Sequence, residues 1–174
     1  MARYRLWAPW RLEYIQAVHR QGEGIAGASD ECIFCTKPAL GDDAEALIPH
    51  RGDRCFVMLN AFPYTSGHVM VAPFEHTADL AGLDDQTAAE LMAITQLSLR
   101  ALGSAYGPDG YNVGINLGRI AGAGIADHVH LHVVPRWAGD TNFMPVVADT
   151  RVLPQSLGDS YAAIRDAFAA LPVT

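Results

Sequence analysis

The sequence has few charged residues, few cysteines and no long apolar run, and each of these absences excludes a class of protein. Charged residues make up 18% of the 174 residues, and 19 Asp and Glu against 12 Lys and Arg give a formal net charge of −7. This acidic balance argues against broad binding to nucleic acid or to an anionic membrane, because both need a positive field. No apolar run approaches the ~20 residues that cross a bilayer, and the start lacks the features of a signal peptide. We therefore expect a cytoplasmic protein with no nucleic-acid or membrane partner.

The cysteines are too few for a disulfide framework. Cys32 and Cys35 form a Cys-x-x-Cys pair, for which redox chemistry, metal binding and chance are the alternatives. A thioredoxin-like pair begins a helix after a strand, whereas this pair follows the loop-like residues 21–29 with no strand pattern before them. Metal binding is the better interpretation, provided that two further ligands come from elsewhere. Cys55 lies in an apolar run and is expected to be an ordinary buried strand residue.

The pattern of apolar residues predicts one α+β domain over residues 1–174, with an N-terminal arm over about residues 1–28. Half of the residues are hydrophobic, as in a globular protein. The expected elements are a β-hairpin formed by residues 54–60 and 67–72, a helix over about 84–104, strands at 110–117 and 128–134, and an amphipathic helix over 157–171. Paired strands interrupted by a central and a C-terminal helix indicate an antiparallel sheet.

Three histidines, His128, His130 and His132, alternate with apolar residues. In a strand this alternation directs all three imidazoles to one face. Residues four positions apart in a strand lie about 13 Å apart, so the three histidines cannot share one metal ion, although a His-x-His pair could hold one and a metalloenzyme site stays an alternative. An imidazole that attacks phosphorus, flanked by imidazoles that bind phosphate oxygens, gives all three a use. The glycine-rich residues 118–127 before them could cradle phosphate through backbone N–H groups, with an ordinary flexible turn as the alternative.

Two segments together resemble a known family. Residues 128–134, His-Val-His-Leu-His-Val-Val, are similar to the signature of the histidine triad (HIT) family, and residues 60–76 resemble its upstream hairpin. The resemblance extends over roughly residues 30–137 and implies a HIT-like fold. The flanking segments 6–15, 116–118 and 134–143 resemble the bacterial diadenosine-polyphosphate phosphorylase branch of that family.

The resemblance implies a nucleotidyl transferase or hydrolase that cleaves dinucleoside polyphosphates such as diadenosine tetraphosphate. His130 would be the nucleophile, His132 would contact phosphate, and His128 would orient the nucleophile through its backbone or bind metal. The favoured substrate is an adenine nucleotide, the acceptor is inorganic phosphate or water, and no catalytic metal is required. The alternatives are a hydrolase of dinucleoside polyphosphates or purine nucleotide phosphoramidates, and a slow adenylate-binding sensor. The resemblance also implies a homodimer or a higher homo-oligomer.

Polar and glycine residues around the triad are candidates for nucleotide binding. The resemblance places Asn60 on the ribose and Asn116 on phosphate near the scissile bond, although Asn60 could also cap the hairpin turn. Gly122 and Gly124 belong to the glycine-rich segment. The wider family often has Gln at position 124 and phosphorylase-like sequences have Ser, so the group that assists the leaving phosphate stays open.

Three aromatic residues complete the candidates. Phe34 and Phe62 are expected in the core unless they sandwich the base, and Trp137 could bind nucleotide, pack a loop or form a dimer contact.

The resemblance also implies a structural zinc site. Its ligands would be Cys32, Cys35, His76 and His128, which together would fasten the N-terminal segment to the triad. The alternative is a metal-free cysteine pair, since some relatives lack the cysteines.

Overall fold

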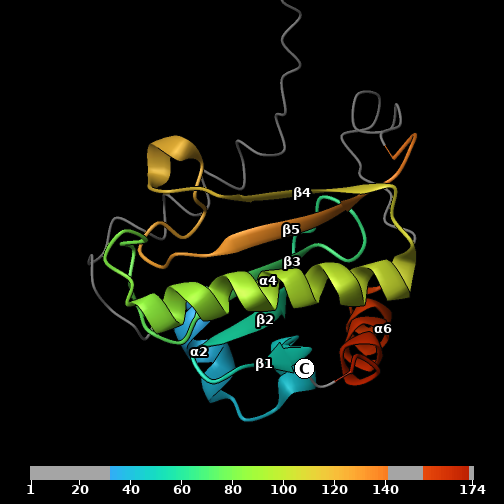
Figure 1. Cartoon of the computed structure of the whole chain (residues 1–174), viewed down its shortest axis with the longest axis horizontal. Coiled ribbons are helices and arrows are strands. Elements are labelled where there is room, and N and C mark those ends of the chain that lie inside the picture. The colour runs from blue at the N-terminus through green and yellow to red at the C-terminus, as the bar shows by residue number, and fades with distance from the viewer. Residues whose placement is uncertain (1–31, 141–154, 173–174) are drawn as a thin grey trace, which may run out of the picture.

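A five-stranded antiparallel sheet forms the centre of the structure (Figure 1), a computed structural model that describes residues 32–140 and 155–172. The strands are β1 (His50–Arg51), β2 (Cys55–Leu59), β3 (Val69–Pro73), β4 (Gly110–Ile115) and β5 (Leu131–Arg136), in the order β1-β2-β3-β5-β4. The helices are α2 (Ile33–Ala39), α3 (Asp43–Ala46), α4 (Asp85–Tyr106), α6 (Leu157–Ala169) and the 3-10 helix η2 (Arg119–Ala121). The expected α+β class with an antiparallel sheet is confirmed, whereas the expected arm lies outside the described residues.

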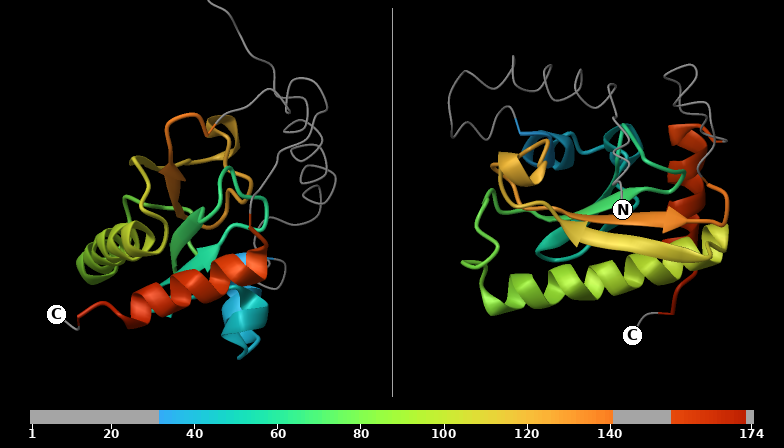
Figure 2. Two further views of the ribbon diagram at one scale, coloured as in Figure 1. Left: turned by 90° about the vertical axis from the view of Figure 1, so that its right-hand side faces the viewer. Right: turned by 90° about the horizontal axis from the view of Figure 1, so that it is seen from above.

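The two faces of the sheet carry two separate cores. Val57, Val71 and Val133 are fully buried on the face that packs against α4 and α6. Phe56 and Met70, which point to the opposite face, belong to a smaller cluster with α2. The right-hand view of Figure 2 shows α4 and α2 on opposite sides of the sheet. Neither α4 nor any other helix within residues 32–140 and 155–172 combines the length and apolarity needed to cross a bilayer.

The hairpin and the two long helices follow the sequence prediction closely. β2 and β3 pair from Cys55 with Pro73 to Leu59 with Val69. α4 begins after Asp84, whose carboxylate accepts hydrogen bonds from the backbone N–H groups of Gln86 and Thr87, and is followed by Gly107 in the left-handed conformation. Asp84 and Gly107 set the helix at 85–106, against the expected 84–104.

The strand prediction for residues 128–134 is wrong for the first three of them. β5 begins only at Leu131, which is also the first residue of this segment that pairs with β3. Before it, the backbone N–H of Val129 donates instead to the carbonyl of Thr77, beyond the end of β3. His128 and His130 therefore lie just outside the sheet ladder, and among the three histidines only His132 is a strand residue.

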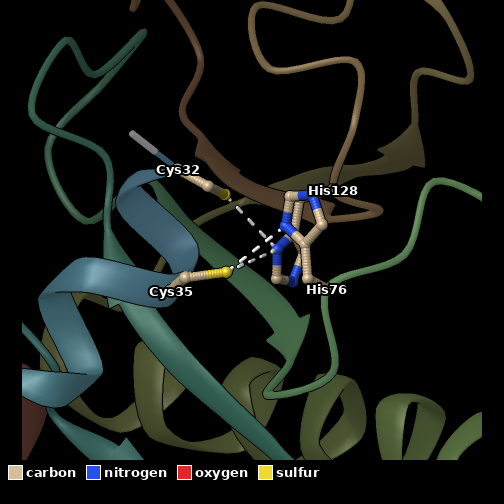
Figure 3. Close-up of side chains that lie close together, drawn as sticks. All are labelled: Cys32, Cys35, His76 and His128. Atoms are coloured by element: carbon tan, nitrogen blue, oxygen red, sulfur yellow. Dashed lines mark hydrogen bonds between the residues drawn. The ribbon is translucent and has the colours of Figure 1, made fainter. Parts of the chain in front are cut away.

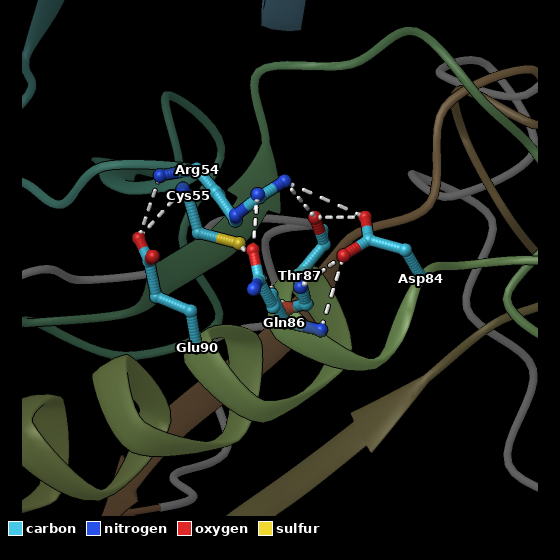
Figure 4. Close-up of polar contacts among 6 residues, drawn as sticks. All are labelled: Arg54, Cys55, Asp84, Gln86, Thr87 and Glu90. Carbon is cyan, nitrogen blue, oxygen red and sulfur yellow. Dashed lines mark hydrogen bonds and ion pairs between the residues drawn. The ribbon is translucent and has the colours of Figure 1, made fainter.

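Glu90 joins α4 to the turn that leads into β2 (Figure 4). Its carboxylate accepts hydrogen bonds from the backbone N–H groups of Arg54 at 2.8 Å and Cys55 at 3.0 Å. A Cβ at Gly52 would lie 2.3 Å from the same carboxylate oxygen, so glycine is needed there for Glu90 to reach the turn. Cys55 is fully buried in β2, which confirms its expected role.

Candidate active site

His130 has one fixed protonation state. Its Nδ1 lies 2.8 Å from the backbone carbonyl oxygen of His128. A carbonyl can only accept, so Nδ1 must carry the proton and Nε2 must hold the lone pair. Burial lowers the pKa of His130, opposed by that hydrogen bond, and only 4% of the residue is exposed. The imidazole is therefore neutral at pH 7, as a nitrogen nucleophile must be.

Phe34 packs directly against this imidazole. The two ring centroids lie 4.7 Å apart and the planes meet at 30°. Phe34 also contacts His128 and Phe56, and only 1% of it is exposed. Phe34 is therefore a buried residue of the smaller core cluster, and no pattern in the sequence indicated that it touches the central histidine.

His132 receives a hydrogen bond from His68, a residue that the sequence reasoning missed. The backbone N–H of Tyr64 donates to Nδ1 of the buried His68 at 3.2 Å, so the proton of His68 is on Nε2. That Nε2 lies 3.0 Å from Nδ1 of His132 and donates to it. Nε2 of His132 therefore carries a proton and can donate to an anion beside His130, whose ring centroid is 5.0 Å away. A lone histidine in an apolar run looks like a core residue, which is why His68 was missed.

Asn60 and Phe62 lie at the turn of the hairpin. The carboxamide oxygen of Asn60 accepts a hydrogen bond from the backbone N–H of Phe62 at 2.9 Å, so the capping alternative for Asn60 is realised. Its amide nitrogen lies 3.5 Å from Nδ1 of His68, which places Asn60 next to the histidine row. Phe62 is 70% exposed, so the expectation that it belongs to the core is wrong.

Asn116 lies on the strand side of the histidine row. It follows Ile115, the last residue of β4, whose partner in the ladder is Leu131, the residue after His130. Gly122 ends η2 with φ of 93°, a conformation that favours glycine, and Gly124 lies in the loop between η2 and His128.

Trp137 lies away from the histidine row. It follows the far end of β5 and packs edge-on against Tyr106, with ring centroids 6.5 Å apart. It lies five positions beyond His132, a distance of about 16 Å along an extended chain. The structure therefore does not bring Trp137 to the imidazoles, and its ring packs instead against the last residue of α4.

Two cysteines and two histidines converge beside the triad (Figure 3). Cys32 precedes α2 and Cys35 lies in its first turn, while His76 follows β3. The Sγ of Cys32 lies 3.4 Å from Nδ1 of His128, and the Sγ of Cys35 lies 3.3 Å from Nδ1 of His76 and 3.7 Å from Nδ1 of His128. All four ligand atoms lie within 4.8 Å of one another.

The donor atoms of this cluster suit a tetrahedral metal ion. Bonds of about 2.0–2.3 Å to zinc put ligand atoms roughly 3.3–3.8 Å apart, which matches the three sulfur–nitrogen distances. Nε2 of His128 donates to the carbonyl of Pro73 at 2.9 Å, so the lone pair of Nδ1 faces the sulfurs. Burial lowers the pKa of His128 to about 4, which keeps it neutral. Burial and the neighbouring Cys32 raise the pKa of Cys35 to about 11, a cost that a bound cation would offset.

Comparison with known proteins agrees with this geometry. Residues 44–139 match the HIT domain. The chain is 39% identical over 168 residues to an AP-4-A phosphorylase of Mycobacterium tuberculosis, covering 97% of this chain and 86% of that protein. An adenosine 5'-monophosphoramidase of Schizosaccharomyces pombe is 34% identical over 105 residues, 60% of this chain and 74% of that protein.

A solved structure gives the same result at the level of the fold. A zinc-bound histidine triad family protein from Mycobacterium smegmatis superposes with a TM-score of 0.66 at 30% identity, covering 82% of this chain and 96% of that one. The resemblance of residues 128–134 and 60–76 is thereby confirmed, and the chain belongs to the HIT domain family.

Proposed function

We propose that this protein is a nucleotidyl transferase that cleaves dinucleoside polyphosphates, with diadenosine tetraphosphate as a substrate and inorganic phosphate as the acceptor. The observation that carries the proposal is the hydrogen bond from Nδ1 of His130 to the carbonyl of His128, which leaves a neutral, buried imidazole with its Nε2 lone pair available. Likeness to the mycobacterial AP-4-A phosphorylase, over 86% of that protein's length, supports the choice of substrate.

In the first step Nε2 of His130 attacks the α-phosphorus. A nitrogen–phosphorus bond forms, the bond from that phosphorus to the bridging oxygen breaks, and ATP departs with the bond's electron pair. The carbonyl of His128 holds the Nδ1 proton while positive charge develops on the ring. The Nε2–H of His132, oriented by His68, donates to a phosphate oxygen and stabilises its negative charge.

In the second step an oxygen of inorganic phosphate attacks the phosphorus of adenylyl-His130. The nitrogen–phosphorus bond breaks, its electron pair returns to Nε2, and ADP leaves. Water in place of phosphate would give AMP by the same path. The phosphorylase resemblance of the flanks favours phosphate, while Gly124 offers no side-chain donor to the departing or incoming phosphate.

A second candidate is hydrolysis of purine nucleotide phosphoramidates. It uses the same attack by His130, and likeness to the Schizosaccharomyces pombe adenosine 5'-monophosphoramidase supports it. A sensor that binds adenylate and turns over slowly is a third alternative, but binding alone does not require the fixed lone pair on His130.

We assign the nucleotide contacts as follows from their places around the triad. Asn60 would hold the ribose and the exposed ring of Phe62 would contact the base, since both lie on the turn next to His68. Asn116 would contact phosphate beside His130, and the backbone near Gly122 and Gly124 would bind the rest of the polyphosphate.

We propose that the Cys32–Cys35–His76–His128 cluster holds a structural zinc ion, as the sulfur–nitrogen distances support. Zinc would supply a fixed joint between α2 and the segment that carries the triad. All four ligand positions come from the chain, so the ion would have no open position for water and would take no direct part in the reaction.

We propose a homodimer in which two copies pair along β4. This strand is one of the two edges of the sheet, and no strand within residues 32–140 and 155–172 covers its outer side. An open edge presents unpaired backbone groups, and Val113 in it is 46% exposed. Residues 1–28 remain a proposed arm of this single domain, and we also propose that the protein is cytoplasmic.

Product analysis tests the proposed reaction. The protein is incubated with diadenosine tetraphosphate, with and without labelled inorganic phosphate, and the products are separated by chromatography. We expect ATP and ADP with label in the ADP. ATP and AMP at an undiminished rate without phosphate would instead identify a hydrolase, and no cleavage by either route would contradict the proposal.

A further inference from the structure

Helix α2 takes its position from the metal cluster. With seven residues it is too short to be stable alone, so its contacts must hold it in place. Cys32, at its N-cap, makes no side-chain cap, and its sulfur points to His128 instead. Cys35, one turn later, contacts both histidines of the cluster. The turn that carries Phe34 is therefore clamped on both sides by metal-ligand side chains.

Two contacts orient the imidazole of His130, and both lead back to this cluster. One is the hydrogen bond to the carbonyl of His128, whose own side chain is a ligand. The other is the ring of Phe34, whose centroid lies 4.7 Å from that of the imidazole, with the two planes at 30°. The hydrogen bond fixes the proton on Nδ1. The stacked ring limits rotation of the imidazole about the Cβ–Cγ bond of His130.

We propose that Phe34 is a positioning residue for the nucleophile, and that occupancy of the Cys32–Cys35–His76–His128 cluster controls how firmly Phe34 holds His130. In-line attack on phosphorus requires that the Nε2 lone pair point at the reacting atom. Without the stacked ring, the imidazole can turn away from the His128 carbonyl and exchange tautomers. A misplacement of about 1 Å costs roughly a hundredfold in rate, so a looser ring is expected to lower kcat ten- to a hundredfold.

The burial of Phe34 separates this role from base binding. Only 1% of the residue is exposed, so a purine has no face of this ring to stack on. Its loss should therefore change kcat and leave KM nearly unchanged. A residue that contacted the base would change KM instead.

The same small core offers a matched control. Phe56 is fully buried in β2, its ring lies 6.5 Å from that of Phe34, and it stacks on Phe74. Phe56→Leu and Phe34→Leu each replace one phenyl ring of the same cluster by the same smaller side chain. A loss of rate caused by general loosening of this core should appear in both variants. A loss of rate caused by the missing contact with His130 should appear only in Phe34→Leu.

The kinetic arm of the test rests on the proposed function. Steady-state kcat and KM for diadenosine tetraphosphate are measured for the metal-loaded wild type, Phe34→Leu and Phe56→Leu. We expect kcat to fall ten- to a hundredfold only in Phe34→Leu, with KM within about twofold in all three. An equal fall in both variants, or a change confined to KM, would overturn the positioning role. If Phe34→Leu does not fold, judged by thermal melting, Phe34→Met takes its place, because the unbranched methionine side chain adapts better to an irregular core gap.

The second arm needs no activity. Proteins labelled with 15N in histidine are examined by NMR, and the signals of His130 are identified by their loss in His130→Ala. The metal-loaded wild type should show the proton on Nδ1 alone, and both Phe34→Leu and the metal-stripped wild type should show mixed tautomers. If removal of the metal unfolds the wild type, Cys35→Ser takes the place of the metal-stripped protein. An unchanged His130 spectrum in Phe34→Leu contradicts the positioning role, and an unchanged spectrum after metal loss contradicts the link to the cluster. Absence of cleavage by the wild type would instead overturn the proposed function and leave this arm intact.

Discussion

At the scale of single residues, the protonation of His130 decides whether the site can act as a nucleophile. His130→Ala removes the attacking nitrogen and little of the pocket, so turnover should be abolished while nucleotide binding persists. Calorimetric titration with a nucleotide and a cleavage assay measure the two effects separately. Asn60→Ala, as a comparison, removes one contact worth about 1 kcal/mol and should weaken binding roughly fivefold. Formation of a labelled nucleotidyl enzyme by His130→Ala would contradict the assignment.

His68 acts one hydrogen bond further from the reaction, by holding the proton of His132 on Nε2. His68→Leu removes that donor, and loss of about 1.4 kcal/mol of transition-state stabilisation corresponds to a tenfold lower kcat. His68→Gln keeps an N–H donor near the same place and should recover part of the rate. Equal rates in His68→Leu and His68→Gln, with melting temperatures unchanged, would show that the hydrogen bond from His68 to His132 does not contribute to the rate.

At the scale of elements, zinc is expected to fasten α2 to the triad segment. Protein purified without added zinc should contain about one equivalent per chain, and Cys35→Ser should lose most of it because one of four ligands is gone. Cys55→Ala is the control, since Cys55 is buried in β2 outside the cluster. Metal analysis far below one equivalent, with both thiols of the wild type freely titratable, would refute the site.

The contact between β1 and α6 is expected to depend on pH. His50 stacks on Phe168 with ring centroids 4.7 Å apart, and burial lowers the pKa of His50 while Glu90 opposes the shift. A histidine whose folded pKa lies below its unfolded value of about 6.5 stabilises the fold above that pH and loses this contribution as pH falls.

Urea unfolding at pH 8 and pH 5.5 measures this dependence. The drop in the free energy of unfolding should be smaller for His50→Phe, which keeps the stacked ring and cannot take up a proton. An identical drop in both proteins would show that His50 does not contribute.

Sequence patterns located the long elements but not the short ones. The apolar runs around β2 and β3, and the caps Asp84 and Gly107 of α4, are local signals that the folded chain respects. α2 was missed because its N-cap is Cys32, whose side chain contacts His128 and does not cap the helix as Ser, Thr, Asp or Asn would. The start of β5 was placed too early because Val129 bonds to a segment more than fifty residues away in sequence, which no local pattern reveals.

The site could be predicted where one segment carries it and not where distant segments meet. The triad spans five residues, so alternation alone indicated its shared role. Cys32 and His128 are separated by 96 positions, and only the family resemblance joined them before the structure did. The contacts of His130 with Phe34 and of His132 with His68 depend on the packing of α2 and the hairpin, which lies beyond any sequence pattern.

At the scale of the whole molecule, the open edge of β4 is expected to join two copies. Size-exclusion chromatography with light scattering should give twice the mass of one chain or a higher multiple. Val113→Lys places a charge on this exposed edge and should shift the protein towards monomer, while Met92→Lys, at a 52% exposed position of α4, should not. A monomeric wild type would contradict the pairing.

The central claim is that the reaction passes through a covalent bond to His130. Each in-line displacement inverts the configuration at phosphorus, so two displacements restore it. Diadenosine tetraphosphate with one chiral phosphorothioate at the α-position is cleaved in phosphate buffer, and the configuration of the resulting thio-ADP is determined by 31P NMR. The account predicts net retention, because His130 and then phosphate attack in turn; net inversion would show that phosphate attacks the substrate directly and would contradict the role given to His130.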